Sequence, residues 1–379
     1  MAAPVSAQDT RAELIGAKQA EKAKASTPYQ PSSFEKIMFK LEENFASPPS
    51  GFYPRVGTIP QGGSFSAGVG YRQFFARRAI LDLRSAYSLK QYLQLEAAIR
   101  TPWHGRSRTL FEVGGAYLDA PQVGYYGVGM EGSGRTNFRL KRTNGYGLVE
   151  FKPTSWVRLE GEAGYDAVET STGKGSHPSI ETIYTPADTP GLFENLSFIR
   201  GRGLAAIDWR VSPGYSRTGG FYGVTVENFT DTDDAYSFEK VTGELIQHVP
   251  IMRQTWILSF RGRVETVLND EDAVPFYLLP QLGSGRTLRG YQTGRFRDRH
   301  SILGSAEFRW IVNRLALDMA LFYDAGKVTS RREDLDFENL KSDWGIGARF
   351  HGFTRTVLRV EGARGDQGWR LVVAMGPAW

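Results

Sequence analysis

The sequence predicts an all-β protein, a transmembrane antiparallel β-barrel of about sixteen strands preceded by a short N-terminal helical or disordered segment. Three observations predict this fold. From Phe52 onward, apolar and polar residues alternate with a period of two. The connections between the alternating runs are short and long in turn. The chain also has 43 glycines among 379 residues and 13% aromatic residues, an unusual mixture for a soluble enzyme.

The first 51 residues differ from the rest of the chain. Residues 10–25 are rich in Ala, Lys and Glu, whereas "SSFEKIMFKLEENF" at 32–45 has helical periodicity with Ser33 as a candidate N-cap. The apolar face of this helix would comprise Phe34, Ile37, Met38 and Leu41. Because "SPPSG" at 47–51 breaks any helix, we expect residues 1–51 to form an N-terminal periplasmic segment and residues 52–379 to form the barrel.

Two strands near the C-terminus illustrate the alternation. In the last strand, the apolar positions are Trp369, Leu371, Val373, Met375, Pro377 and Trp379. In an earlier strand, the apolar positions Leu315, Leu317, Met319, Leu321 and Tyr323 oppose Ala316, Asp318, Ala320, Phe322, Asp324 and Gly326. In a membrane barrel the apolar face contacts lipid and the polar face lines a hydrated lumen, whereas in a soluble sandwich the charges would face outside water.

The lengths of the connections favour the membrane barrel over the sandwich. Every second connection is short, including those at Pro153, Asn313 and Gly352. The interleaved set contains all the long ones, at 119–136, 170–195, 269–298 and 329–339. Short periplasmic turns and long external loops are typical of outer-membrane barrels, and a soluble sandwich has no reason to sort its loops in this way.

Composition excludes several classes of protein. No apolar run approaches the roughly 18 residues of a membrane-spanning helix. The absence of cysteine removes disulfides, thiolate metal sites and cysteine nucleophiles. Because 46 basic residues are scattered among 41 acidic ones, for a net charge of +5, we expect no nucleic-acid partner.

Motifs for catalysis and cofactors are weak. "GVGMEG" at 127–132 lies in a loop with no helix after it, so it does not predict a dinucleotide site. The five histidines are widely spaced, and no G-x-S-x-G elbow occurs, so we predict no metal, no cofactor and no enzyme activity. "GSGRT" occurs at 132–136 and again at 283–287, and we attribute the repeat to flexible loop composition.

The loop "LPQLGSGRTLRGYQTGRFRDRH" at 279–300 gathers arginines and glycines. Within it, Leu288, Arg289, Gly290 and Tyr291 form "LRGY", which resembles the [V/L]-R-G-[F/Y] motif in the sixth external loop of BamA/TamA-type outer-membrane assembly barrels. The next strand, "GSAEFRW" at 304–310, also resembles that family. "LFYDAGKV" at 321–328 resembles its F-x-D-x-G segment, through Phe322, Asp324 and Gly326. The loop joins the eleventh and twelfth of the sixteen strands, as in the family.

Residue chemistry predicts a specific interaction for this loop. Alternation places Glu307 and Asp324 on the lumenal face, and the guanidinium of Arg289 can donate hydrogen bonds to both carboxylates. Gly290 would permit a tight backbone beside it. We therefore expect Arg289 to hold the loop inside the barrel, the alternative being that it is one solvated arginine among several. The other arginines of the loop are expected at the outer surface.

The resemblance implies a location and an activity. It implies a barrel in the bacterial outer membrane, in contact with membrane lipid, that acts in insertion or translocation of proteins or lipids. Trp379 resembles the C-terminal aromatic by which such barrels are recognised for insertion. Because only 51 residues precede Phe52, we expect no POTRA domain here, and a separate periplasmic POTRA-containing protein or a client protein becomes a candidate partner. The alternatives are a pore-forming or structural barrel and, less favoured, a barrel-embedded lipid hydrolase. The oligomeric state stays open.

Overall fold

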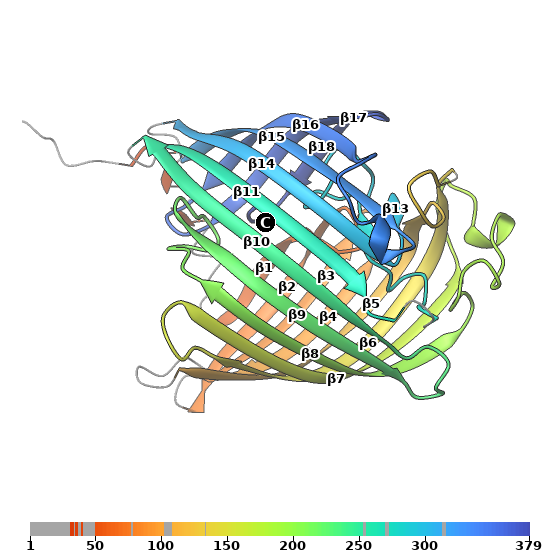
Figure 1. Ribbon diagram of the computed structural model, residues 1–379. Coiled ribbons are helices and arrows are strands. Elements are labelled where there is room, and N and C mark those ends of the chain that lie inside the picture. Colours follow the sequence, from red (N-terminus) through yellow and green to blue (C-terminus); the bar gives the residue numbers. More distant parts are fainter. Residues whose placement is uncertain are drawn as a thin grey trace, which may run out of the picture.

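A computed structural model of the chain describes residues 31–33, 35–36, 39–40, 50–76, 79–101, 108–132, 134–252, 255–269, 273–312 and 316–379. Sixteen strands form one antiparallel sheet in sequence order, and a separate two-stranded hairpin, β12–β13, lies inside the longest loop. The predicted all-β fold and strand count are confirmed. Figure 1 shows the strands tilted side by side around a single wall.

The strands of the wall are β1 (Gly51–Thr58), β2 (Phe65–Phe75), β3 (Ala79–Ser88), β4 (Leu93–Arg100), β5 (Thr109–Tyr125), β6 (Thr136–Phe151), β7 (Val157–Thr172), β8 (Asn195–Asp208), β9 (Gly219–Asp231), β10 (Phe238–Met252), β11 (Trp256–Val267), β14 (His300–Val312), β15 (Leu317–Thr329), β16 (Lys341–His351), β17 (Thr356–Gly365) and β18 (Gly368–Ala374). The inner hairpin comprises β12 (Gln281–Leu282) and β13 (Phe296–Arg297). Two 3-10 helices, η2 (Ile180–Thr182) and η3 (Arg332–Asp334), lie in loops.

Period-two alternation sorts side chains between the two faces of the wall. In β15, Asp318, Phe322 and Asp324 are buried, whereas Leu321 and Tyr323 are exposed on the outside. The same strand therefore supplies lumenal carboxylates and an apolar outer surface, as a membrane barrel requires. The predicted assignment of faces is correct for β15, whereas Leu315 lies outside the described residues.

The connections sort by length between the two ends of the barrel. One end, here called the short-turn end, carries the connections between β2 and β3, β6 and β7, and β14 and β15. The other, the long-loop end, carries residues 173–194, 268–299 and 330–340. Figure 1 shows β13 at this end. Because consecutive antiparallel strands reverse direction, every second connection must lie at the same end.

Mixed charges line much of the interior. Arg200 on β8 lies 3.0 Å from the Asp166 carboxylate and also pairs with Glu162. Farther along the wall, the ammonium of Lys240 on β10 lies 3.4 Å from Glu227 on β9 and 3.1 Å from Glu265 on β11. Basic and acidic side chains lie next to one another on these strands, so the positive and negative charges of this part of the lumen are locally balanced.

The long-loop end contains an apolar core instead of the fully hydrated lumen that we expected. Phe138 on β6, Ile180 in η2 and Phe276 in the 268–299 loop are each fully buried in one hydrophobic cluster. The ring centroids of Phe138 and Phe276 are 4.8 Å apart. The long loops thus pack apolar side chains inside the wall, because they can bury such residues against the strand ends.

The last residues of the chain leave the wall, so the strand prediction is wrong for residues 375–379. β18 ends at Ala374, and Gly376 takes a φ of +81°, which glycine tolerates better than other residues. Trp379 then packs against Leu204 and Ile246 on the opposite side of the barrel and stacks on His248, with ring centroids 5.7 Å apart. The aromatic C-terminus lies inside the barrel rather than on its lipid face.

The connection between β8 and β9 also enters the short-turn end. Its Tyr215 is buried, donates a 2.8 Å hydrogen bond to Asp318 on β15, and stacks on His351 of β16 with ring centroids 4.0 Å apart. The backbone of Thr356 donates to the Gly214 carbonyl at 2.9 Å. This connection therefore crosses from β8–β9 to β14–β17, and together with the C-terminal residues it fills the short-turn end.

The sheet has a seam between its first and last strands. β1 pairs with β2, and β18 pairs with β17 from Arg359 to Gly365, but no ladder joins β1 to β18 among the described strands. Gly57 and Met375 lie close together across the seam: a Cβ added to Gly57 would lie 3.8 Å from the Met375 sulfur. After β18, the chain turns into the lumen at Gly376.

Only part of the N-terminal segment is described. Ser32 and Glu35 cap a short helical stretch reciprocally, through hydrogen bonds of 2.7 and 3.2 Å, so the cap is Ser32 and not Ser33. Phe39 stacks on Phe353 in the β16–β17 turn at 4.0 Å. The expected helix face of Phe34, Ile37, Met38 and Leu41, like residues 1–30, lies outside the described residues. Nowhere in the described part of the chain is a helix long and apolar enough to span a membrane.

Candidate functional site: the LRGY segment and its charge cluster

The LRGY segment sits in a loop with a narrow neck. The Gly294 N–H donates to the Gly283 carbonyl at 2.9 Å, and both glycines have positive φ, of +69° and +93°. Within the neck, the Tyr291 N–H donates to the Leu288 carbonyl at 3.1 Å, which forms a tight turn around Arg289. Glycine at the two neck positions is what allows the chain to reverse twice over so short a length.

Arg289 contacts both carboxylates that the sequence predicted as its partners. Its Nε donates to Asp324 Oδ2 at 2.7 Å and its Nη2 donates to Asp324 Oδ1 at 3.0 Å, a bidentate pair. Its Nη1 donates to Glu307 Oε2 at 3.3 Å. The side chain of Arg289 is only 1% exposed, so the alternative of a solvated arginine does not describe this structure.

Three further charged residues complete the cluster, and sequence reasoning missed them. Glu361 on β17 accepts from Arg289 Nη1 at 3.4 Å and from Arg349 Nη2 at 3.0 Å. Arg349 on β16 also pairs with Glu307, and Arg359 Nη1 donates to the second oxygen of Glu361 at 2.6 Å. Their alternation with small or apolar neighbours, in "GARFH" and "RVEGARG", was the signal that could have placed them in the lumen.

The cluster is electrically balanced and almost dry. It contains three guanidinium groups, on Arg289, Arg349 and Arg359, and three carboxylates, on Glu307, Asp324 and Glu361, all at or below 3% exposure. Buried ion pairs of this kind tolerate loss of one partner badly, because the remaining charge is left without compensation. The arrangement therefore suits a fixed attachment point better than a reactive centre.

The neighbours of Arg289 in the motif also have defined positions. Leu288 and Tyr291 are buried in an apolar cluster with Leu282 and Phe296 of the β12–β13 hairpin. At Gly290, an added Cβ would lie 2.7 Å from the Asp343 Cβ and 2.7 Å from the Gly365 backbone nitrogen. Only glycine fits this close approach between the loop and the wall.

The F-x-D-x-G segment on β15 contacts the same loop. The Arg289 guanidinium carbon lies 3.5 Å above the ring of Phe322, a cation–π contact that adds to its ion pairs. At Gly326, an added Cβ would lie 2.6 Å from the Ile302 carbonyl and 3.0 Å from Leu282 of the hairpin. Phe322, Asp324 and Gly326 thus share the inward face of one strand and all meet the loop.

Other arginines of the loop are not at the surface as expected. Arg297 is fully buried and donates to the Phe276 carbonyl and to Gln281, at 3.0 Å each. Arg295 is buried and donates to the Glu131 carbonyl at 3.2 Å. Backbone carbonyls, which the sequence pattern does not reveal, provide these partners. Arg286 is exposed, as predicted.

The described residues offer little for catalysis. No group of three or more His, Asp or Glu side chains among them is placed to hold a metal ion. The Ser216 hydroxyl donates to the Ser212 carbonyl at 3.1 Å rather than to a histidine, and His248 contacts Ser259 at 2.8 Å without a carboxylate in the same set of hydrogen bonds. Neither arrangement is a nucleophile–base–acid triad.

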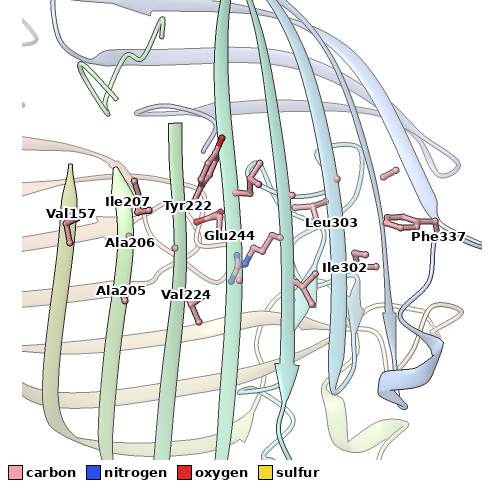
Figure 2. Close-up of a pocket in the computed structure, with 18 of the residues that line it drawn as sticks. Val157, Ala205, Ala206, Ile207, Tyr222, Val224, Glu244, Ile302, Leu303 and Phe337 are labelled. Carbon is pink, nitrogen blue, oxygen red and sulfur yellow. The ribbon is translucent and has the colours of Figure 1, made fainter. Parts of the chain in front are cut away.

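The outer wall carries an apolar groove of about 830 Å³ that crosses the strands from β7 to β15. Figure 2 shows Val157, Ile207 and Tyr222 on neighbouring strands of this groove, with Phe337 toward its other end. Its floor includes Gly243 and Gly262, where an added Cβ would meet no atom within 4 Å. In a bilayer, lipid chains would fill such a groove, as they cover the rest of the apolar outer face.

Comparisons with known proteins agree with the motifs. Residues 213–352 match the Omp85 superfamily domain. No curated protein matches the chain in sequence. Among solved structures, the chain resembles BamA from Haemophilus ducreyi lacking POTRA domains 1–3, with 12% identity and a TM-score of 0.63 over 86% of this chain and 69% of that one. It also resembles CdiB from Acinetobacter baumannii, with 11% identity and a TM-score of 0.54 over 86% of this chain and 58% of that one.

These matches place the LRGY segment within a known domain. The Omp85 match begins in the β8–β9 connection and ends after β16, so it includes Arg289, Glu307 and Asp324. The predicted resemblance to BamA/TamA-type barrels is confirmed by the domain match and by the shared fold. The expectation that the chain is not an enzyme agrees with the same domain match.

Proposed function

We propose that this Omp85-type barrel acts in the bacterial outer membrane, where it inserts or translocates proteins or lipids, and that Arg289 holds its sixth external loop inside the lumen. In this proposal the long-loop end faces outward and the short-turn end faces the periplasm. The observation that carries the proposal is the seam between β1 and β18.

An unpaired seam has a physical consequence in a membrane. Backbone N–H and C=O groups along an open strand edge cannot bond to water in the hydrocarbon region, so such an edge is costly unless something pairs with it. β18 is seven residues long and ends at Ala374, and no described strand pairs with the free edge of β1. A strand or a lipid headgroup entering from the membrane would supply the missing partners.

The proposed role of the loop follows from its position. Arg289 joins the loop to β14, β15 and β17 through Glu307, Asp324 and Glu361. The wall near the seam is then braced from inside by a buried ion-pair cluster, whereas no hydrogen-bonded ladder crosses the seam between the described strands β1 and β18. One side of the barrel can open while the other keeps its shape, which is what lateral insertion requires.

The proposed partners are membrane lipid and a client chain. A separate periplasmic protein with POTRA domains could present clients at the short-turn end, where Phe39 and the β16–β17 turn meet. The alternative, a barrel that conducts small solutes, is less well supported because apolar loops, the LRGY segment and the C-terminal residues occupy its interior.

Cross-linking the seam tests the proposal. The chain has no cysteine, so Gly57→Cys combined with Met375→Cys introduces the only thiols, one on each side of the seam. We expect a short thiol-reactive cross-linker to abolish insertion of an unfolded outer-membrane barrel into liposomes that contain the variant. Insertion is measured as protease-resistant client.

The matched control joins two strands that are already paired. Leu83 on β3 and Ala97 on β4 are register partners, so Leu83→Cys with Ala97→Cys should cross-link without loss of insertion. Insertion at the parental rate after complete cross-linking of the seam would contradict lateral insertion through it.

A further inference from the structure

A cavity of about 600 Å³ lies at the long-loop end, between the LRGY loop and the seam. Its wall is built from the end of β1, most of β18, the turns after β1 and β3, the end of β5, the residue before β6, and residues 284–286 and 292–293 of the loop. It is separate from the ion-pair contacts of Arg289, because Arg289 and its carboxylate partners are not among its lining residues. Of the six-residue charge cluster around Arg289, only Arg359 lines this cavity.

The cavity is basic and contains no compensating acid. Its basic residues are Lys90, Arg135, Arg286, Arg359 and Arg370, and none of its described lining residues is Asp or Glu. Only Arg359 pairs with a carboxylate, that of Glu361. Arg200, Lys240 and Arg289, deeper in the lumen, each lie beside carboxylates, whereas the described lining of this cavity gathers five basic residues without an acidic one.

The remaining four basic side chains have neutral partners or none. Lys90 donates to the Gly62 carbonyl at 3.0 Å, and Arg135 donates to Asn137 at 3.2 Å. Arg370 donates to the carbonyls of Arg289 and Tyr291. The guanidinium of Arg286 makes no hydrogen bond or ion pair with any described residue. Carbonyl groups orient these cations but do not neutralise them.

The cations are close enough to influence one another. Burial lowers the pKa of Lys90, and the positive charges of Arg135 and Arg370 lower it further. These three residues come from the β3–β4 turn, the residue before β6 and β18, so the fold brings like charges together from distant parts of the chain. A bound anion would remove this repulsion.

Both copies of the repeated pentapeptide "GSGRT" contribute to this cavity. Arg135 belongs to the first "GSGRT" and Arg286 to the second, and both line this one cavity together with Ser284 and Gly285. The sequence pattern by itself indicates only flexible loop composition. The structure brings the two repeats to a single space, each contributing a guanidinium.

The rim of the cavity is apolar where it meets the seam. Leu371 and Val373 line it from β18 and are exposed on the outer face, and Phe65 lines it from β2. A ligand with an anionic group inside and an apolar group outside would match both surfaces. Arginine forks and lysine ammonium groups are the side chains that bind phosphate best.

We propose that this cavity is a binding site for a phosphate group, carried by an amphiphile whose acyl chains leave through the seam. Lys90, Arg135, Arg286 and Arg370 contact the phosphate, and Leu371 and Val373 contact the first part of the chains. The proposal does not depend on insertion activity, because binding is measured on the protein without a client.

Binding to the purified full chain in a non-ionic detergent tests the site. The probes are dioleoylphosphatidylglycerol, dioleoylglycerol with the same chains but no phosphate, and inorganic phosphate. We expect native mass spectrometry to show retention of the phospholipid and not of dioleoylglycerol. Arg286→Gln should weaken retention about ten-fold, because it removes one charge-assisted contact from an exposed side chain with no structural partner.

Two further variants complete the design. Lys90→Gln with Arg135→Gln should weaken binding by about a hundred-fold if the two contacts add. The matched control is Arg331→Gln, which removes an exposed arginine at the same end, paired with Glu333 and Asp334 outside the cavity, and should leave binding unchanged. Circular dichroism reports whether each variant keeps the barrel.

The probes also distinguish the source of the phosphate. Retention of the phospholipid with displacement by inorganic phosphate supports a lipid headgroup. Binding of inorganic phosphate without preference for the phospholipid over dioleoylglycerol supports a phosphate site but replaces the amphiphile with a soluble anion. Equal binding by the parent and by folded Arg286→Gln and Lys90→Gln/Arg135→Gln variants would overturn the site.

Discussion

Single residues decide how the LRGY loop is attached. Arg289 makes bidentate contact with Asp324 and further contacts with Glu307 and Glu361, all within a buried cluster. Lysine could not replace it, because an ammonium cannot present a planar fork to one carboxylate while reaching two others. Gly290 matters for a different reason, since a Cβ there would collide with Asp343 and the backbone of Gly365.

Arg289→Ala is expected to release the loop without unfolding the wall. Removing one partner from a buried ion-pair network costs about 3–5 kcal/mol, and here that cost falls mainly on the loop, because the strands keep their backbone ladders. Limited proteolysis of the variant in liposomes should show faster cleavage within residues 283–297 than in the parent. Arg331→Gln, outside the cluster, serves as the control. Unchanged cleavage in Arg289→Ala would mean that the apolar contacts of Leu288 and Tyr291 suffice to hold the loop.

At the scale of elements, β15 shows how one strand serves two environments. Its inward residues Asp324 and Phe322 hold Arg289, while Leu321 and Tyr323 face outward. The inward face of β15 continues onto β14, because Glu307 of β14 is the register partner of Phe322 of β15. A shift of one residue in this register would move the carboxylates into lipid, so burial of the cluster also fixes the pairing.

On the outward face of β15, the free-energy cost of introducing a charged residue should depend on the depth of that residue in the bilayer. Leu321→Arg, in the middle of the strand, is expected to cost about 2–4 kcal/mol, whereas Leu317→Arg, at the first residue of the strand, should cost about 0–1 kcal/mol. Urea-induced unfolding in liposomes measures both free energies. Equal costs at the two positions would show that Leu321 does not lie near the middle of the bilayer.

The whole molecule combines a continuous wall with an occupied interior. Loops fill the long-loop end through the cluster around Phe138 and Phe276, and the β8–β9 connection and Trp379 fill the short-turn end. A sixteen-stranded barrel would otherwise enclose an aqueous channel of porin size. The seam is then the one long break in the hydrogen bonding among the described strands of the wall.

Conductance should reflect that occupied interior. We expect small or flickering single-channel currents from the parent in planar bilayers, because the hydrated path is obstructed. Removing residues 284–293 should increase the conductance. Gly283 and Gly294 are hydrogen-bonded to each other, so the chain can be rejoined there without disturbing the strands. Shortening the loop at 330–340 is the control and should have no such effect. Large, stable, ion-selective currents from the parent would favour the pore alternative.

The sequence alone determined the features that depend on local periodicity. Alternation identifies the strands and their faces, because a strand places successive side chains on opposite sides whatever its neighbours are. The same rule, with the LRGY and F-x-D-x-G motifs, predicts that Arg289 meets Glu307 and Asp324. Residue type and order suffice for this contact because both carboxylates lie on strands adjacent to one another and to the loop.

Tertiary structure decided everything that depends on contacts across the barrel. Alternation continues through Trp379, yet Gly376 turns the chain inward and Trp379 stacks on His248 across the lumen. The sequence pattern cannot show which backbone carbonyls accept hydrogen bonds from Arg295 and Arg297. It also cannot show that Arg135 and Arg286 line one cavity. The physical reason is that closing a sheet into a barrel brings together residues far apart in the chain, and their packing and charge depend on that closure, which periodicity does not encode.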